Sequence, residues 1–158
     1  MKHLIAILFS FVSVTAFAGD ASTQVDEILK MQQEPEGVVF EIVTGKDDGL
    51  EWALPLSKKY IDQLKQRFPQ MPIAIVTHGR EQFALQKAKQ GENAKVHDLT
   101  QQLVKEGVNL HVCGTYAGWK GLSEDDFPGY VNVSAAGPAQ INDYIALGYL
   151  KVKIKKPE

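Results

Sequence analysis

The sequence predicts an α/β domain whose centre is a doubly wound sheet of about five mostly parallel strands. Strand-like and helix-like segments alternate along the chain, which is the order that produces a parallel sheet with helices on both faces. Two strand-like segments, residues 38–43 and 72–77, are mostly apolar and rich in β-branched side chains, as expected of strands buried on both faces. The chain of 158 residues is long enough for one ordinary domain with a sizeable core.

Residues 1–18 have the three parts of a secretory signal peptide. Lys2 supplies the positive charge, residues 4–14 form the apolar segment, and residues 16–18 (Ala-Phe-Ala) match a cleavage site. We therefore expect cleavage after Ala18 and a periplasmic protein of 158 − 18 = 140 residues, whose formal charge moves from −2 to −3 because Lys2 is lost. An uncleaved membrane anchor is the alternative, but the apolar segment is short for a membrane span.

The first half of the mature chain is expected to run helix, strand, helix. Residues 19–36 form a polar extension whose few apolar residues have helical spacing, so a short helix is expected there. The main domain is placed at residues 37–154 and begins with the strand at 38–43. Residues 50–68 carry an apolar stripe typical of an amphipathic helix, and Pro55 marks a candidate start for it.

The middle of the chain contributes a second buried strand and a further helix. The strand at 72–77 runs into a His-Gly turn at residues 78–79. Residues 81–89 have helical propensity with a weak apolar pattern. Residues 95–106 form an amphipathic helix, and Gly107 is well placed to cap its C-terminal end.

The next segment is predicted to be a strand that leads directly into a helix. Residues 108–113 alternate between apolar and polar side chains, and the small-residue segment 116–120 reads as a restart in helical form. Residues 123–126 (Ser-Glu-Asp-Asp) have the composition of a capped single turn. Residues 130–133 form a short strand.

The C-terminal part is predicted to be a helix followed by an edge strand. Ser134 is a candidate N-cap, Pro138 fits the first helical turn, and Gly148 ends the helix. Residues 149–154 alternate, with two lysines on one face, which suits a half-exposed edge strand protected by charge. Residues 155–158 are a tail.

Composition narrows the classes of partner and of chemistry. The sequence has no basic tract, which argues against nucleic acid and against anionic membrane surfaces as partners. Cys113 is the only cysteine, and in an exported chain a lone cysteine is an intermolecular bridge, a free thiol or an inert core residue. There is no Cys-x-x-Cys of a dithiol enzyme, no Gly-x-Ser-x-Gly and no phosphate-binding glycine loop. We expect no cofactor.

Cys113 is the leading candidate for chemistry because of its position. It ends a predicted strand, and open α/β sheets bind ligands at the carboxyl ends of their strands. A helix that begins directly after it would place partial positive charge beside the sulfur and favour the thiolate. Gly114 permits close backbone approach, Thr115 offers a hydroxyl, and Tyr116 is a candidate wall of the pocket. The alternative is an inert core cysteine at the end of a strand.

Three histidines bear on this site. His78 ends another strand just before Gly79, and if the two strands are neighbours its imidazole lines the same crevice, where it activates the thiol or orients a sulfur species. His111 shares a strand face with Cys113, so the set of His78, His111 and Cys113 is a weak alternative site for copper or zinc. The competing interpretation is that each histidine is a hydrogen-bonded structural residue. His97, on a helix, is expected at the surface.

The chain resembles a known family over residues 37–154. The resemblance rests on a His-Gly turn, one cysteine at a strand end and a common order of elements, carried by residues 76–79 (Val-Thr-His-Gly), 107–115 (Gly-Val-Asn-Leu-His-Val-Cys-Gly-Thr), 122–128 and 148–152 (Gly-Tyr-Leu-Lys-Val). These segments are similar to the DsrE/DsrF/TusD-like sulfur-relay family, in particular to its exported branch.

The resemblance implies a flavodoxin-like three-layer sandwich that assembles as trimers or hexamers. It also implies that Cys113 carries sulfur as a persulfide between donor and acceptor proteins or small thiols, with His78 in the His-Gly turn that exported relatives often show. The chain departs from the cytoplasmic carriers in having a signal peptide and in lacking a second cysteine near Tyr116.

Two other functions stay open at this point. The chain could be a non-catalytic binding or assembly module, in which Cys113 is buried and the crevice holds a ligand or metal through His78 and His111. It could also be an oxidation sensor in which Cys113 forms an intermolecular disulfide.

Overall fold

The structure is a computed structural model that describes residues 19–156. The signal peptide predicted at residues 1–18 and the last two residues of the predicted tail lie outside the described part. Its elements are α1 (Ala21–Leu29), β1 (Val38–Ile42), α2 (Gly49–Arg67), β2 (Ile73–Thr77), the 3₁₀ turns η1 (Arg80–Leu85) and η2 (Lys87–Lys89), α3 (Ala94–Lys105), β3 (Val108–Cys113), α4 (Gly114–Trp119), the 3₁₀ turn η3 (Glu124–Asp126), β4 (Asn132–Ser134), α5 (Gly137–Ala146) and β5 (Leu150–Ile154). None of the helices in this part of the chain is long and apolar enough to cross a membrane.

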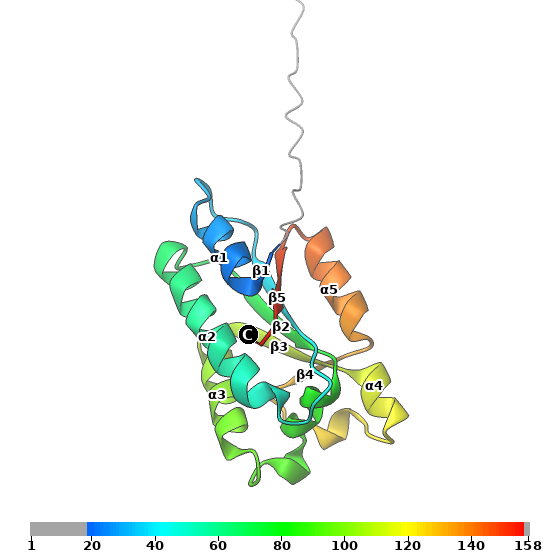
Figure 1. The fold of residues 1–158 in the computed structure, drawn as a ribbon. Coiled ribbons are helices and arrows are strands. Elements are labelled where there is room, and N and C mark those ends of the chain that lie inside the picture. Colours follow the sequence, from blue (N-terminus) through cyan, green and yellow to red (C-terminus); the bar gives the residue numbers. More distant parts are fainter. Residues whose placement is uncertain (1–18, 157–158) are drawn as a thin grey trace, which may run out of the picture.

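The five strands form one parallel sheet in the order β4-β3-β2-β1-β5. Helices α1, α2 and α3 cover one face of the sheet and α5 covers the other (Figure 1). The predicted three-layer, flavodoxin-like α/β sandwich is therefore confirmed. Because the strands are parallel, their carboxyl ends meet at one edge of the sheet, and the candidate site residues lie at this edge.

The two central strands are buried on both faces, as their apolar sequences predict. Phe40 of β1 and Ile75 of β2 belong to the large core beneath α1, α2 and α3. Val39 and Val76, one position away on the same strands, belong to a smaller cluster with Ile141 of α5. Successive side chains of a strand point to opposite faces, so this alternation shows which face each later residue of β2 and β3 occupies.

β5 is the edge strand that the sequence predicts. Lys151 and Lys153 are exposed, whereas Val152 and Ile154 are buried. The backbone N–H of Lys153 donates to the side-chain oxygen of Gln24 on α1 at 3.0 Å, so the short helix of the N-terminal extension is attached to the sheet edge. The unpaired edge is thus protected both by charge and by α1.

Two helix starts differ from those predicted. α2 begins at Gly49, and Pro55 lies inside the helix. Proline is tolerated there because the hydrogen bond it cannot donate would go to the carbonyl of Glu51, an exposed residue of the first turn. Ser134 is not an N-cap but the last residue of β4, and α5 is capped by Ala136 with proline in its first turn, as predicted.

Residues 81–89 form two 3₁₀ turns in place of one helix. The backbone of Gln86 is extended, with φ −63° and ψ 141°, and separates η1 from η2. The predicted end of the next helix is confirmed, because Gly107 follows α3 with a φ of 86°. The turn at Ser123 is confirmed as well, with its backbone N–H donating to Asp126 at 2.7 Å.

We expected His97 to lie at the surface, but its side chain is fully buried. Its Nδ1 lies 2.5 Å from the hydroxyl of Tyr130, and its Nε2 lies 3.0 Å from the carbonyl oxygen of Ala84. The turns of η1 and the segment before β4 close over this side of α3. Because those contacts come from distant parts of the chain, the helical pattern around His97 does not reveal them.

Candidate functional site

Cys113 lies where the sequence places it, at the carboxyl end of β3 and at the start of α4. Its Sγ accepts a hydrogen bond from the backbone N–H of Tyr116 at 3.4 Å and so caps the helix. The residue is 5% exposed. This N–H is the one hydrogen-bond donor to Sγ within residues 19–156.

The backbone of Cys113 is fixed by Gln82, a residue that the sequence does not single out. The N–H of Cys113 donates to Gln82 Oε1 at 2.8 Å, and Gln82 Nε2 donates to the carbonyl of Cys113 at 3.2 Å. Gln82 is fully buried in η1. The amide thus joins the turn after β2 to the cysteine at the end of β3 and fixes the position at which α4 begins.

The start of α4 is also held against the loop between β4 and α5. Thr115 donates both its N–H and its hydroxyl to the carbonyl oxygen of Ala135, at 2.9 and 2.7 Å. A Cβ at Gly114 would lie 2.9 Å from the carbonyl oxygen of Ser134, so only glycine fits without displacement. Gly114 and Thr115 therefore position the start of α4.

Tyr116 forms an aromatic contact across the same edge. Its ring packs edge-on against Phe83 of η1, with ring centroids 5.1 Å apart. Lys120 Nζ lies 5.9 Å from the centre of the ring, and Trp119, whose ring centroid is 6.0 Å away, is 78% exposed. Tyr116 thus packs between Phe83, Trp119 and Lys120, and Trp119 points to solvent.

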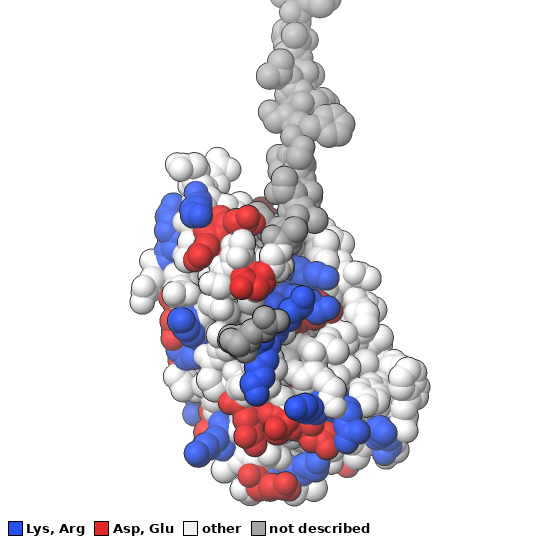
Figure 2. Space-filling view, in the orientation of Figure 1, with Lys and Arg blue, Asp and Glu red and all other residues white. Residues whose placement is uncertain are grey.

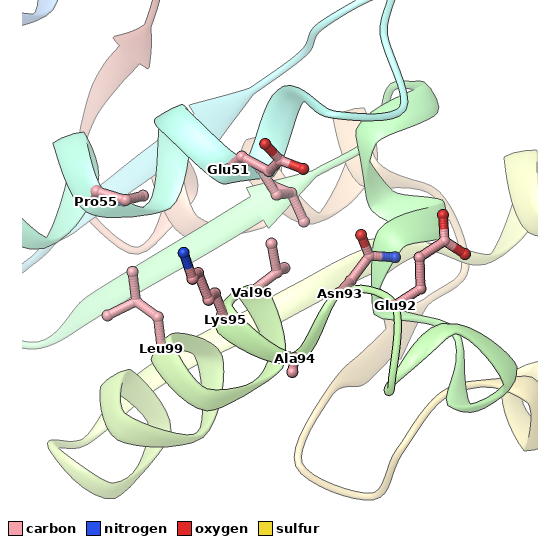
Figure 3. A pocket seen from close by; sticks show the side chains of 9 residues that line it. Glu51, Pro55, Glu92, Asn93, Ala94, Lys95, Val96 and Leu99 are labelled. Atoms are coloured by element: carbon pink, nitrogen blue, oxygen red, sulfur yellow. The ribbon is translucent and has the colours of Figure 1, made fainter.

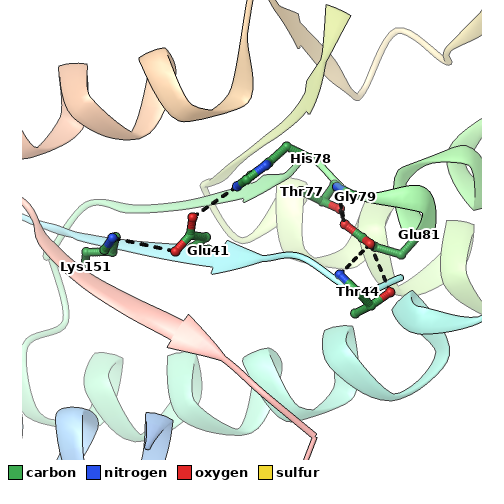
Figure 4. A network of polar contacts seen from close by, with 7 residues as sticks. All are labelled: Glu41, Thr44, Thr77, His78, Gly79, Glu81 and Lys151. Atoms are coloured by element: carbon green, nitrogen blue, oxygen red, sulfur yellow. Dashed lines mark hydrogen bonds and ion pairs between the residues drawn. The ribbon is translucent and has the colours of Figure 1, made fainter. Parts of the chain in front are cut away.

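His78 follows the end of β2, the strand beside β3, and by alternation it shares the α5 side of the sheet with Val76. Its Nε2 lies 3.1 Å from Glu41 Oε1, and the other oxygen of Glu41 lies 3.7 Å from Lys151 Nζ (Figure 4). The hydrogen bond from His78, assisted by Lys151, holds the pKa of Glu41 below its usual value. Within the described residues no hydrogen bond joins His78 to Cys113, so the histidine is oriented by Glu41 and not by the thiol.

The His-Gly turn itself is held by a buried carboxylate. Glu81 is fully buried; its Oε1 accepts from Thr77 Oγ1 at 2.6 Å and from Gly79 N at 2.8 Å, and its Oε2 accepts from Thr44 N at 2.7 Å and Thr44 Oγ1 at 2.9 Å (Figure 4). A Cβ at residue 79 would collide with Glu81 Oε2 and would lie 2.6 Å from the carbonyl oxygen of Thr44. Gly79 is therefore required by the network that ties the ends of β1 and β2 together.

His111 has a structural role in the fold. Its Nδ1 lies 2.8 Å from Ser134 Oγ and its Nε2 lies 2.8 Å from the hydroxyl of Tyr144, so both ring nitrogens are occupied. Among residues 19–156, no group of three His, Cys, Asp or Glu side chains is arranged to hold a metal ion. The alternative ligand set of His78, His111 and Cys113 is thus not brought together in the described structure.

Burial of two histidines predicts a stability that falls in acid. Desolvation lowers the pKa of both His97 and His111 in the folded state, although the carbonyl bond to His97 partly opposes this. The unfolded chain then binds more protons, so stability is complete above the unfolded pKa of about 6.5 and is lost as pH falls toward the folded pKa. Urea unfolding between pH 8 and pH 5 should show a decline of up to about 1.4 kcal/mol per pH unit for each histidine. A His111→Asn variant should show a shallower decline, and an unchanged slope would contradict this assignment.

A separate cavity of about 620 Å³ lies between the N-terminal parts of α2 and α3. Figure 3 shows Glu51 and Pro55 on one side of it, with Val96 and Leu99 on the other. None of the predicted site residues lines this cavity. Its walls combine apolar side chains with charges of both signs, and they carry no arrangement typical of catalysis.

Three solved structures share this fold. The protein of unknown function MTH1491 from Methanobacterium thermoautotrophicum superposes with a TM-score of 0.58 and 21% identity, over 74% of this chain and 97% of that chain. The ychN protein from E. coli gives a TM-score of 0.57 and 13% identity, over 75% and 99% of the two chains. The conserved protein of unknown function BT1422 from Bacteroides thetaiotaomicron gives 0.54 and 13%, over 75% and 95%.

Sequence comparison adds nothing to these structures. No family model matches the chain. No curated protein matches it either. At 13 to 21% identity the structural likeness shows the fold alone. The chain therefore shares a three-layer α/β fold with these three proteins, and its function has to be inferred from its own residues.

Proposed function

We propose that this chain is an exported, DsrE-like sulfur-relay protein that carries sulfur on Cys113 as a persulfide. The observation that carries the proposal is the hydrogen bond from Tyr116 N–H to Cys113 Sγ at the start of α4. This contact fixes Sγ at the first turn of α4, and a persulfide formed on it, being more acidic than a thiol, would carry its negative charge on the outer sulfur. The fold shared with the ychN protein is consistent with this family.

The transfer needs no cofactor and no net oxidation. The Cys113 thiolate attacks the outer sulfur of a donor persulfide, a new S–S bond forms on Cys113, the donor's own S–S bond breaks, and the donor leaves as a thiolate. Delivery repeats the exchange in reverse, with an acceptor thiolate attacking the outer sulfur on Cys113. Donors and acceptors are proteins or small thiols of the periplasm, and a trimeric or hexameric assembly belongs to the same proposal.

The rigid setting of the thiol suits a carrier. Gln82 holds the backbone of Cys113 on both sides, and Thr115 holds the start of α4, so loading the sulfur requires no rearrangement of the strand. His78, whose ring is held by Glu41 of β1, keeps the carboxyl end of β2 polar. With 5% of the residue exposed, Cys113 admits a small donor more readily than a bulky one.

The proposal predicts complete transfer from the loaded protein to a small thiol. The protein is loaded with polysulfide, freed of excess reagent and incubated with cysteine, after which an alkylating agent traps all thiols and persulfides. We expect the protein to carry the alkyl group without the added sulfur, while trapped cysteine persulfide appears in an amount equal to the sulfur lost. Sulfur that stays on the protein after long incubation would show a dead-end adduct and would contradict a relay.

The burial of Cys113 favours one other function, that of a non-catalytic binding module. In that case the thiol packs against α4, and the aromatic residues around it build an interface. A Cys113→Ala variant that retains every ligand affinity and the native assembly, together with a native thiol that takes up no sulfur, would favour this function over the relay.

A further inference from the structure

A surface cavity of about 330 Å³ lies beside α4, at the sheet edge that carries Cys113. It is formed by the loop after β1, the 3₁₀ turns after β2 and the segment that follows α4. Its lining residues are Asp47, Arg80, Phe83, Gln86, Lys89, Lys120 and Leu122. No part of the proposed relay so far uses these side chains.

The cavity carries an excess of positive charge. Asp47 is the single acidic residue of its lining, and Arg80 holds it through two parallel hydrogen bonds of 3.1 and 3.0 Å. Within residues 19–156, Lys89 and Lys120 form no ion pair, whereas Asp47 is paired with Arg80. The pKa of Asp47 is lowered, first by the hydrogen bond from Arg80 and further by both lysines, in accord with their closeness. Basic and acidic side chains lie side by side over this end of the molecule (Figure 2).

The cavity is connected to the cysteine through neighbouring residues. Phe83 lines it and packs against Tyr116, whose backbone N–H donates to Cys113 Sγ. Gln82, next to Phe83 in the chain, holds the backbone of Cys113. Lys120 lines the cavity and also lies over the ring of Tyr116. Contacts through Phe83, Gln82 and Lys120 therefore link the cavity to the segment around Cys113.

We propose that this cavity binds a small, doubly charged oxyanion, the class to which sulfate and thiosulfate belong. Two lysines that form no ion pair match two negative charges. The assignment of such an anion as a sulfur donor rests on the proposed relay. The Cys113 thiolate attacks the outer sulfur of thiosulfate, a new S–S bond forms on Cys113, the S–S bond of thiosulfate breaks, and sulfite leaves. Sulfate has no such sulfur and cannot act as a donor. Anion binding itself does not depend on the relay.

Isothermal titration with sulfate and with thiosulfate, at low and constant ionic strength, tests the site. We expect one saturable site for each dianion and none for chloride. Lys89→Gln and Lys120→Gln should each weaken binding about tenfold, because each removes a charged contact. Asp47→Asn should strengthen it several-fold by removing the opposing charge. Lys59→Gln, which removes an exposed charge on α2 away from the cavity, is the matched control and should leave affinity unchanged.

The outcomes for the cavity and for the relay can be told apart. Binding in Cys113→Ser that equals binding in the native protein supports the cavity whether or not the thiol takes up sulfur. The site is overturned if no saturable binding is seen. It is also overturned if the two lysine variants, the aspartate variant and the control bind with equal affinity. Both conclusions hold even if polysulfide loads Cys113. Sulfate and thiosulfate binding without sulfur transfer from thiosulfate supports an anion site and removes its role as a donor site.

Discussion

Replacement of Cys113 by serine is expected to abolish sulfur uptake completely while leaving the fold intact. Serine keeps an acceptor for the N–H of Tyr116, so the start of α4 is preserved. The variant should unfold within about 0.5 kcal/mol of the native protein. Exposure to polysulfide followed by intact-mass measurement should show the added sulfur in the native protein and none in the variant.

The absence of any other cysteine makes this comparison sharp. Sulfur that remains with the serine variant would be bound non-covalently or at another residue. That result would contradict the carrier role of Cys113. A Gln82→Glu variant provides a second comparison, since it keeps the acceptor for Cys113 N–H but loses the donor to its carbonyl. We expect slower uptake in that variant, not its loss.

Replacement of Glu81 by alanine is expected to give the largest loss of stability, about 3–5 kcal/mol. The carboxylate is fully buried, and its removal leaves the N–H groups of Thr44 and Gly79 and the hydroxyl of Thr77 without their acceptor. The midpoint and slope of urea unfolding measure the effect. Glu92→Ala, an exposed carboxylate, is the control and should change stability by less than about 0.5 kcal/mol.

A second pair of variants tests the same network from the backbone side. Gly79→Ala forces a methyl group against Glu81 Oε2 and should cost about 1–3 kcal/mol through the displacement that follows. Gly91→Ala, where nothing lies within 4 Å of the added carbon, should be close to neutral. If Glu81→Ala and Gly79→Ala were both as mild as their controls, the carboxylate would not be what holds the His-Gly turn.

The fold was predictable because its signals are local. The apolar segments at 38–43 and 72–77 have the composition of strands buried on both faces, and β1 and β2 are neighbouring interior strands of the sheet. Alternation with lysines at 149–154 correctly indicated an edge strand. The two wrong helix starts, at Pro55 and Ser134, have a shared cause. Each residue type has a common role near helix N-termini, and the actual start was decided by neighbouring loop contacts.

Only the two central residues of the candidate site could be predicted from the sequence, not the residues that hold them in place. Cys113 and His78 were identified because strand ends can be read from the sequence, and adjacency of β2 and β3 follows from the usual βαβ order. Glu41, Glu81 and Gln82 were missed because each has a hydrogen-bond partner more than 30 residues away in the sequence. Polar residues inside or directly after apolar strands were the available signal, since a buried polar side chain needs partners.

The central claim is that Cys113 is a thiol that accepts sulfur in the folded protein. The most direct test is the intact mass of the native protein before and after polysulfide, with an alkylating agent as a probe of the free thiol. We predict a gain of one sulfur atom that maps to Cys113, is removed by reductant and blocks alkylation of the original thiol. A native thiol that gains no sulfur and also resists alkylation would contradict the relay and leave only the fold.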